Sequence, residues 1–236
     1  MLRHDGKAGS EIKIIAHIYT DFPEKFGIPR QSGLVPELTG RIVFAPEYRA
    51  PEIVKGLEGF NYIWLLWQFD MEKRKHWSAT VKPPRLGGNT HMGVFATRSP
   101  FRPNGIGLSS VKLEGITQTG EGPILYVAGA DMRDGTPIYD IKPYLPYCDC
   151  HADAVGGFAA GVEDYALRVD FPEELLQIFP REKQKAVVKV LEQDPRPSYH
   201  NDAARQYGVS FAGYDVHFYV KDDVVHVTEV VKLKQD

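Results

Sequence analysis

Two arginines, two prolines and two glycines lie within the eleven residues from Thr97 to Gly107. Proline fixes the backbone φ angle and glycine allows another group to approach closely, so this segment displays Arg98 and Arg102 on a stiff loop. Such a loop suits the recognition of a phosphate, a carboxylate or a base, because guanidinium groups bind planar anions through paired hydrogen bonds. A rigid connection between strands that carries surface arginines explains the pattern equally well.

Three carboxylates follow a predicted strand over Pro123–Gly129: Asp131, Asp134 and Asp140. Carboxylates at a strand end accept hydrogen bonds from ribose hydroxyls or an amino group. Asp134-Gly135 is also a strong turn signal, and taken alone it favours a plain turn. A nuclease or hydrolase that holds Mg²⁺ on these carboxylates is a weaker hypothesis, because such a site needs convergent oxygen ligands and nothing in the sequence shows convergence.

Cys148, Cys150 and His151 invite comparison with a zinc site. Zinc sites usually space their cysteines by about two to four residues and add a second ligand pair. Here one residue separates the cysteines and the chain has only two of them, so we predict no metal. The sequence also lacks a dinucleotide-binding glycine pattern after a strand, a Walker A motif and a nucleophile elbow.

The net charge of −3 is unevenly distributed along the 236 residues. Residues 1–150 carry 18 basic against 16 acidic side chains, and residues 151–236 carry 10 against 15. The window from Lys73 to Leu113 contains no acidic residue. It holds eight cations, interleaved with Trp77, Phe95 and Phe101, namely Lys73, Arg74, Lys75, Lys82, Arg85, Arg98, Arg102 and Lys112. Clustered cations favour a polyanion because phosphate binding releases counterions, whereas solvated loops that pair with acids elsewhere in the fold are an equally good interpretation.

The elements that must position these residues are mainly strands. Over the first 150 residues the predicted strands are Ile12–Tyr19, Arg41–Ala45, Phe60–Phe69, Met92–Thr97, Leu108–Ile116 and Pro123–Gly129, with one short helix at Glu47–Lys55. The nearly all-apolar Phe60–Phe69 is predicted to be buried on both sides. Long loops at 21–40, 71–91 and 98–107 connect the strands, which predicts a barrel or sandwich that presents a site on its loops.

Residues beyond 150 change in character. The Gly- and Ala-rich segment 151–161 is predicted to be a linker, and residues 162–236 a small α+β domain. Its predicted elements are a strand at Glu163–Asp170, helices at Pro172–Phe179 and Glu182–Glu192, and strands at Tyr214–Val220 and Val224–Leu233. No apolar run approaches the roughly 20 residues of a membrane span, and the N-terminus lacks the apolar core of a secretory signal. We therefore expect a cytoplasmic protein without a membrane partner.

A series of motifs resembles one known family. In chain order they are Phe26–Leu34, Val81–Asn89, Gly93–Ser99, Phe101–Asn104, Asp134–Pro137, Asp140–Pro146 and Gln193–Tyr199. Together they resemble the TrmO (YaeB/TsaA-like) tRNA methyltransferases, densely over residues 10–150 and more loosely beyond. The resemblance implies a mainly β fold, with a single-sheeted β-barrel domain over residues 1–150. It also implies S-adenosylmethionine bound near a homodimer interface, and methylation of N6 of N6-threonylcarbamoyladenosine at position 37 of threonine tRNA.

The resemblance also implies site residues. Cofactor contacts fall on Pro29, Arg30, Gln31, Asp70, Met71, Arg98, Leu108, Ala128, Gly129, Ala130 and Asp131. Asp70-Met71 departs from the His-Gln of bacterial members, which favours backbone contacts there. The tRNA is expected on Lys73, Arg74, Lys75, Lys82, Arg85, Arg102 and Arg196.

The chemistry of the implied reaction limits the catalytic candidates. A sulfonium methyl group is already activated, so in-line positioning supplies much of the rate. The N6 nitrogen is urea-like and a poor nucleophile until its proton is lost, and Arg30, Arg98 or Arg102 would hold the threonine carboxylate and stabilise the developing anion. The base stays open among Asp134, Tyr139, Asp140 and His91. Trp64 and Trp67 are expected in the core rather than as a stacking platform.

One alternative from another class remains open. A non-catalytic module that binds S-adenosylmethionine or RNA would explain the absence of an obvious base.

Overall fold

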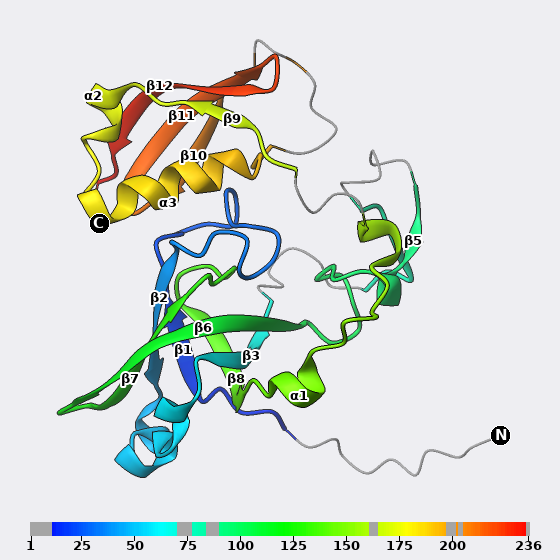
Figure 1. The fold of residues 1–236 in the computed structure, drawn as a ribbon, viewed down its shortest axis with the longest axis vertical. Helices are drawn as coiled ribbons and strands as arrows, with labels where there is room; N and C mark the ends of the chain where they lie inside the picture. Colours follow the sequence, from blue (N-terminus) through cyan, green and yellow to red (C-terminus); the bar gives the residue numbers. More distant parts are fainter. Residues whose placement is uncertain are drawn as a thin grey trace.

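A computed structural model describes residues 11–69, 77–83, 90–160, 165–196, 202 and 205–234 (Figure 1). Six strands close into a barrel in the order β1-β2-β7-β6-β3-β8. Their bounds are β1 Ala16–Tyr19, β2 Thr39–Phe44, β3 Tyr62–Gln68, β6 Ile106–Thr119, β7 Gly122–Ala128 and β8 Thr136–Pro143. All pairs around the ring are antiparallel, so the fold is the barrel and not the sandwich.

The barrel is filled by side chains that alternate along each strand. In β3, Ile63 and Leu65 are fully buried and Trp67 is 8% exposed. The intervening Tyr62 is 42% exposed, and Trp64 is only partly buried. The prediction of a strand buried on both sides is therefore wrong for the single chain, because in a barrel of this size only one face of each strand points inward.

Other local predictions differ in instructive ways. Met92–Thr97 is not one strand: β5 covers only Met92–Gly93, pairs with β4 Thr80–Val81, and is followed by a 3₁₀ turn, η5, at Val94–Ala96. Two short 3₁₀ turns, η1 Pro46–Tyr48 and η2 Pro51–Val54, occupy the region of the helix predicted at Glu47–Lys55, and a third, η3 Leu57–Gly59, follows it. Pro51 lies inside the predicted helix, where a proline has no backbone N–H to donate, so one continuous helix does not form.

The C-terminal unit is a second sheet covered by helices. Its strands run in the order β10-β11-β12-β9, with β9 Arg168–Asp170, β10 Tyr207–Phe211, β11 Tyr214–Lys221 and β12 Val224–Lys232. The helices are α2 Glu173–Leu176 and α3 Arg181–Glu192. Asp222 and Asp223 both have positive φ, which confirms the predicted tight hairpin turn. Along the chain, a one-turn helix, α1 Pro146–Asp149, and a 3₁₀ turn, η6 Gly157–Ala159, separate the last barrel strand from this unit.

The long loop over residues 21–38 joins β1 to β2 and packs against the C-terminal unit. Figure 1 shows it between the barrel and α3. Phe22, Val35 and Leu38 in this loop are buried in the hydrophobic core of the C-terminal unit rather than in the barrel. Within the described residues, no helix is long and apolar enough to span a membrane.

Candidate functional site

Two backbone segments far apart in the sequence meet beside the barrel. The Gly33 amide donates to the Gly129 carbonyl at 2.9 Å, and the Gly129 amide donates to the Leu38 carbonyl at 2.8 Å. Gly129 has φ +74°, and a Cβ there would lie 3.2 Å from the Gly33 Cα. A glycine is therefore needed at position 129 for the loop backbone to come this close. The contact brings the expected cofactor segments 29–31 and 128–131 together.

Arg98 joins this site from a third segment. Its guanidinium donates a hydrogen bond to the Gln31 side-chain oxygen. Both Arg98 and Arg30 are exposed, whereas Pro29, which precedes Arg30, is buried. The stiff arginine loop of the sequence therefore displays a cation beside the Gln31 amide, as an anion-binding site requires.

Asp131 lies at the inner end of the same site. The Ser109 hydroxyl donates to its carboxylate at 2.6 Å, and the Trp67 indole N–H donates to the Ser109 hydroxyl at 3.0 Å. Burial raises the pKa of the Asp131 carboxyl, although the Ser109 hydrogen bond and the Arg98 charge act to lower it. A Cβ on Gly107 would lie 2.2 Å from the Trp67 ring, so the indole can take this position only against a glycine. The chain Trp67–Ser109–Asp131 holds the carboxylate in a fixed orientation.

The remaining cofactor candidates line the strand ends of the site. Ala128 is 7% exposed and Ala130 is 3% exposed, so these residues contribute methyl groups and backbone atoms to the site. Leu108 precedes Ser109 and points outward with 55% of its side chain exposed. Asp70 and Met71 lie outside the described residues.

Gly107 and Ser109 belong to the candidate site by their contacts with Trp67 and Asp131, and sequence reasoning missed them. Ser109 is 2% exposed and is one of the few buried polar residues of the described chain. The signal was present in the alternation of Gly107 and Ser109 on the inward face of a strand otherwise filled by apolar residues. Trp67 is confirmed as a core residue, and Trp64 donates its indole N–H to Asp149 at 2.8 Å.

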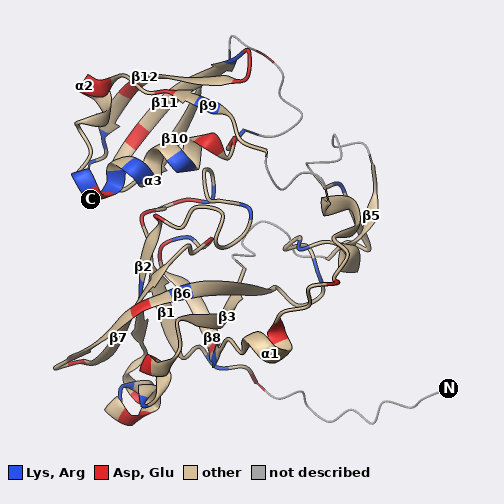
Figure 2. Cartoon of the chain, viewed as in Figure 1, with Lys and Arg blue, Asp and Glu red and all other residues tan. Residues whose placement is uncertain are grey.

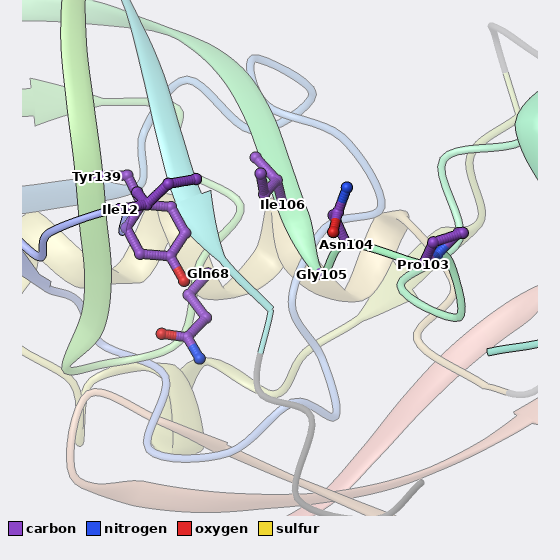
Figure 3. Close-up of a pocket in the computed structure, with 7 residues that line it drawn as sticks. All are labelled: Ile12, Gln68, Pro103, Asn104, Gly105, Ile106 and Tyr139. Carbon is purple, nitrogen blue, oxygen red and sulfur yellow. The ribbon is translucent and has the colours of Figure 1, made fainter. Parts of the chain in front are cut away.

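A hollow of about 340 Å³ lies on the outer side of the same strands (Figure 3). It is lined by Ile12, Gln68, Pro103, Asn104, Gly105, Ile106 and Tyr139. Gln68 and Ile106 are cross-strand partners that point outward, opposite to Trp67 and Gly107. Within one chain, Tyr139 is thus on the other face of the sheet from Ser109 and Asp131.

The other candidate bases are engaged in local structure. The Asp134 carboxylate accepts the Thr20 amide at 2.9 Å and stabilises the turn that the Asp-Gly pair predicts. Asp140 pairs with Lys142 at 2.8 Å. His91 Nδ1 lies 3.4 Å from the Thr80 hydroxyl. None of these contacts joins a candidate base to Arg98 or Gln31 in the described part of the chain.

Figure 2 shows how the lysines and arginines are distributed over the described chain. The candidate tRNA contacts among them differ in their exposure and their partners. Lys82 is exposed, and Arg102 is partly buried with a hydrogen bond to the Thr97 carbonyl at 3.0 Å. Arg196 forms a two-point ion pair with Asp194, at 2.7 Å and 3.0 Å, which competes with phosphate binding. Lys73, Arg74, Lys75 and Arg85 lie outside the described residues.

The chemistry of the site fits a nucleoside-linked amino acid cofactor. Asp131 offers a carboxylate for ribose hydroxyls or an amino group, Arg98 a cation for a carboxylate, and the Ala130 backbone a polar edge for a base. The described residues contain no group of three or more His, Cys, Asp or Glu side chains that could hold a metal ion.

Replacing Asp131 with Asn tests its role through the pH dependence of stability. An acid whose pKa is raised by folding binds more protons in the native state, so its contribution lowers stability as pH rises from the unfolded pKa through the folded pKa. We expect the melting temperature of Asp131→Asn to equal or exceed that of the wild type at pH 7. This advantage should shrink as pH falls below about 4, near the unfolded pKa. Binding of S-adenosylhomocysteine should weaken at the same time, and a variant that is less stable at pH 7 but binds normally would contradict both expectations.

Comparisons with known proteins agree on one family. The family model of the tRNA-methyltransferase O N-terminal domain matches residues 17–150, and that of the TrmO C-terminal domain matches residues 164–233. The Escherichia coli tRNA (adenine(37)-N6)-methyltransferase is 39% identical over 216 residues, which cover 88% of this chain and 92% of that protein. A Pseudomonas aeruginosa protein, whose name proposes an S-adenosylmethionine-dependent methyltransferase, is 40% identical over 92% of this chain and 95% of its own. The crystal structure of TrmO from Pseudomonas aeruginosa superimposes with a TM-score of 0.74 at 35% identity, over 94% of this chain and 99% of that one.

Proposed function

The chain belongs to the TrmO family of S-adenosylmethionine-dependent tRNA (adenine-N6)-methyltransferases, and we propose that its substrate is N6-threonylcarbamoyladenosine at position 37 of threonine tRNA. The methyl group is transferred to N6 of that nucleoside, in the cytoplasm. The single observation that carries the proposal is the convergence of Gln31, Arg98 and Asp131 from three separate segments of the chain.

The same convergence supports the assignment of the cofactor residues. Asp131 would hold a hydroxyl or amino group of S-adenosylmethionine, Arg98 its carboxylate, and the backbone at Ala130 its adenine edge. When bound, the cofactor supplies a methyl group on a positively charged sulfur. The Trp67–Ser109–Asp131 chain fixes the carboxylate, and the Gln31 hydrogen bond limits the motion of Arg98. Both reduce the reorganisation needed to align the reacting atoms.

The substrate requires a cation for the threonine carboxylate and a group that takes the N6 proton. Arg30 is exposed and directly precedes Gln31, so it is our first candidate for the carboxylate, with Arg102 as the second. For the proton, Tyr139 is our candidate because it alone among the proposed bases lines the hollow in Figure 3. Since Tyr139 lies on the outer face of its own barrel, it would act on the methyl site of a second chain.

We propose a homodimer for this reason. Leu108 is 55% exposed beside the buried Ser109, so an exposed apolar side chain adjoins the candidate site. Light scattering of the purified protein should give twice the chain mass, and a monomer at micromolar concentration would contradict the proposal.

The proposed domain organisation remains a prediction: a barrel domain over residues 1–150, a linker over 151–161 and a C-terminal domain over 162–236. It is supported by the closed barrel and by the separate four-stranded sheet.

The decisive experiment uses two preparations of threonine tRNA, with and without the threonylcarbamoyl group. Incubation with S-adenosylmethionine should add one methyl mass to the modified nucleoside only. If the unmodified tRNA is methylated as well, the substrate is plain adenosine and the proposed substrate is wrong. Cofactor binding without transfer to either tRNA would favour the alternative of a non-catalytic binding module.

The basic residues of the acid-free window predict a salt-dependent contact. Lys82→Ala should reduce the slope of log affinity against log salt concentration by about 0.7 to 0.9, the value for one phosphate contact. Lys112→Ala is the matched control, because Lys112 already pairs with Glu114 at 2.7 Å. Filter binding of threonine tRNA over a salt series measures both, and equal slopes for Lys82→Ala and the wild type would remove Lys82 from the tRNA contact.

A further inference from the structure

The C-terminal unit contacts the loop 21–38 through apolar side chains. The Phe22 ring lies 5.2 Å from the Phe211 ring of β10, and Phe22, Val35 and Leu38 are each at most 3% exposed. A Cβ on Gly27 would come within 2.7 Å of Val209 Cγ1, so the loop backbone lies directly on β10. Residues before and after the expected cofactor residues 29–31 are thus part of the C-terminal core.

Polar contacts fix both ends of the same loop. The Ala212 amide donates to the Asp21 carbonyl at 2.9 Å. Lys183 of α3 lies 2.6 Å from the Asp21 carboxylate and 3.1 Å from the Thr39 hydroxyl. At the other end, Lys185 of α3 lies 2.7 Å from Glu37. Burial acts to raise the pKa of the Glu37 carboxyl, but the hydrogen bond and charge of Lys185 outweigh it and the pKa is lowered.

The opposite side of the loop carries the candidate site. Gln31 accepts from Arg98, and Gly33 donates to Gly129. The loop is therefore held between the C-terminal unit and the residues that we assign to the cofactor.

We infer that the C-terminal unit is a positioning element of the methyl-transfer site, which holds the loop 21–38 so that Gln31 and Gly33 meet Arg98 and Gly129. The predicted effect of the C-terminal unit on cofactor binding rests on the proposed function, whereas its predicted effect on the loop conformation does not. The loop 21–38 contains no helix or strand, so it would sample many conformations without the unit. The apparent dissociation constant of a ligand rises in inverse proportion to the fraction of molecules in the competent conformation.

The test compares two valines of the C-terminal core. Val209 and Val225 are both fully buried, but Val209 contacts the loop at Gly27, whereas Val225 lies on β12, two strands away in the sheet. Val209→Ala should raise the dissociation constant for S-adenosylhomocysteine by about tenfold, if the competent fraction falls to about a tenth. It should raise KM for S-adenosylmethionine without lowering kcat at saturation, and leave the affinity for tRNA unchanged. Val225→Ala should lower the melting temperature as much as Val209→Ala does, but it should bind S-adenosylhomocysteine with the affinity of the wild type.

A second readout needs no cofactor. Amide hydrogen exchange at Gly33 and Gly129 should be faster in Val209→Ala and in Lys183→Met than in Val225→Ala, because these amides report the docking of the loop. Unchanged exchange in both loop-contact variants would overturn the inference. So would equal weakening of cofactor binding by Val225→Ala, or a loss of tRNA affinity in place of cofactor affinity. A wild-type protein that binds no S-adenosylhomocysteine would instead overturn the proposed function, while the exchange comparison would still decide the role of the unit.

Discussion

Arg98→Ala should lower methyl transfer by about 100-fold or more and leave the melting temperature close to that of the wild type. Arg98 is exposed and its guanidinium donates a hydrogen bond to the Gln31 side-chain oxygen, so its loss removes little packing. Because Arg98 is assigned to the carboxylate of the cofactor, its loss should misalign the methyl donor, and a misplacement of about 1 Å costs about 100-fold in rate. Single-turnover kinetics on modified threonine tRNA measures the effect separately from product release.

Two controls sharpen this prediction. Arg98→Lys keeps the charge but loses the forked geometry, so its activity should lie between those of Arg98→Ala and the wild type. Arg41→Ala removes an exposed arginine that lies over the Tyr19 ring on the barrel wall, 5.2 Å from its centre, and should leave activity unchanged. A fall in melting temperature with proportional loss of activity for Arg98→Ala would identify Arg98 as a structural residue instead.

The barrel could largely be predicted because its strands bury alternate β-branched and aromatic residues. Strand β8 was missed, since Pro137, Pro143 and the Asp134-Gly135 turn interrupt the pattern that identifies strands. The barrel tolerates both prolines at strand positions near the ends of β8. Strand β10 was missed as well, because its five residues, Tyr207–Phe211, include a glycine and a serine.

The site was less accessible to sequence reasoning. Residue chemistry pointed to Arg98 and Asp131 separately, but only family resemblance placed them at one cofactor. Their convergence depends on the register of β6 and β7 and on the glycine contact between positions 33 and 129, which no local pattern encodes. The shared core was also unpredictable: Phe22, Val35 and Leu38 follow no helix or strand period, so the sequence predicted only a long loop at residues 21–40.

Gly129→Ala should weaken cofactor binding, because the added methyl group pushes the loop 21–38 away from the inner wall of the site. The new Cβ meets the Gly33 backbone at 3.2 Å, and φ +74° is a left-handed conformation. The conformational strain alone costs about 1 to 2 kcal/mol. The steric contact adds a displacement of the loop that carries Gln31, because backbone atoms, unlike a flexible side chain, move only with the whole segment. Calorimetry with S-adenosylhomocysteine should show binding at least about tenfold weaker, which corresponds to about 1.4 kcal/mol.

Gly56→Ala separates the two effects. Gly56 has φ +87° in the 3₁₀ segment before β3, and a Cβ there would meet nothing within 4 Å. Its substitution should therefore lower the free energy of unfolding by a similar strain term and leave cofactor affinity unchanged. If both variants weakened cofactor binding equally, global destabilisation would explain the loss. If only Gly129→Ala does so, the close approach of two glycines is what sets the distance between the loop and the inner wall of the site.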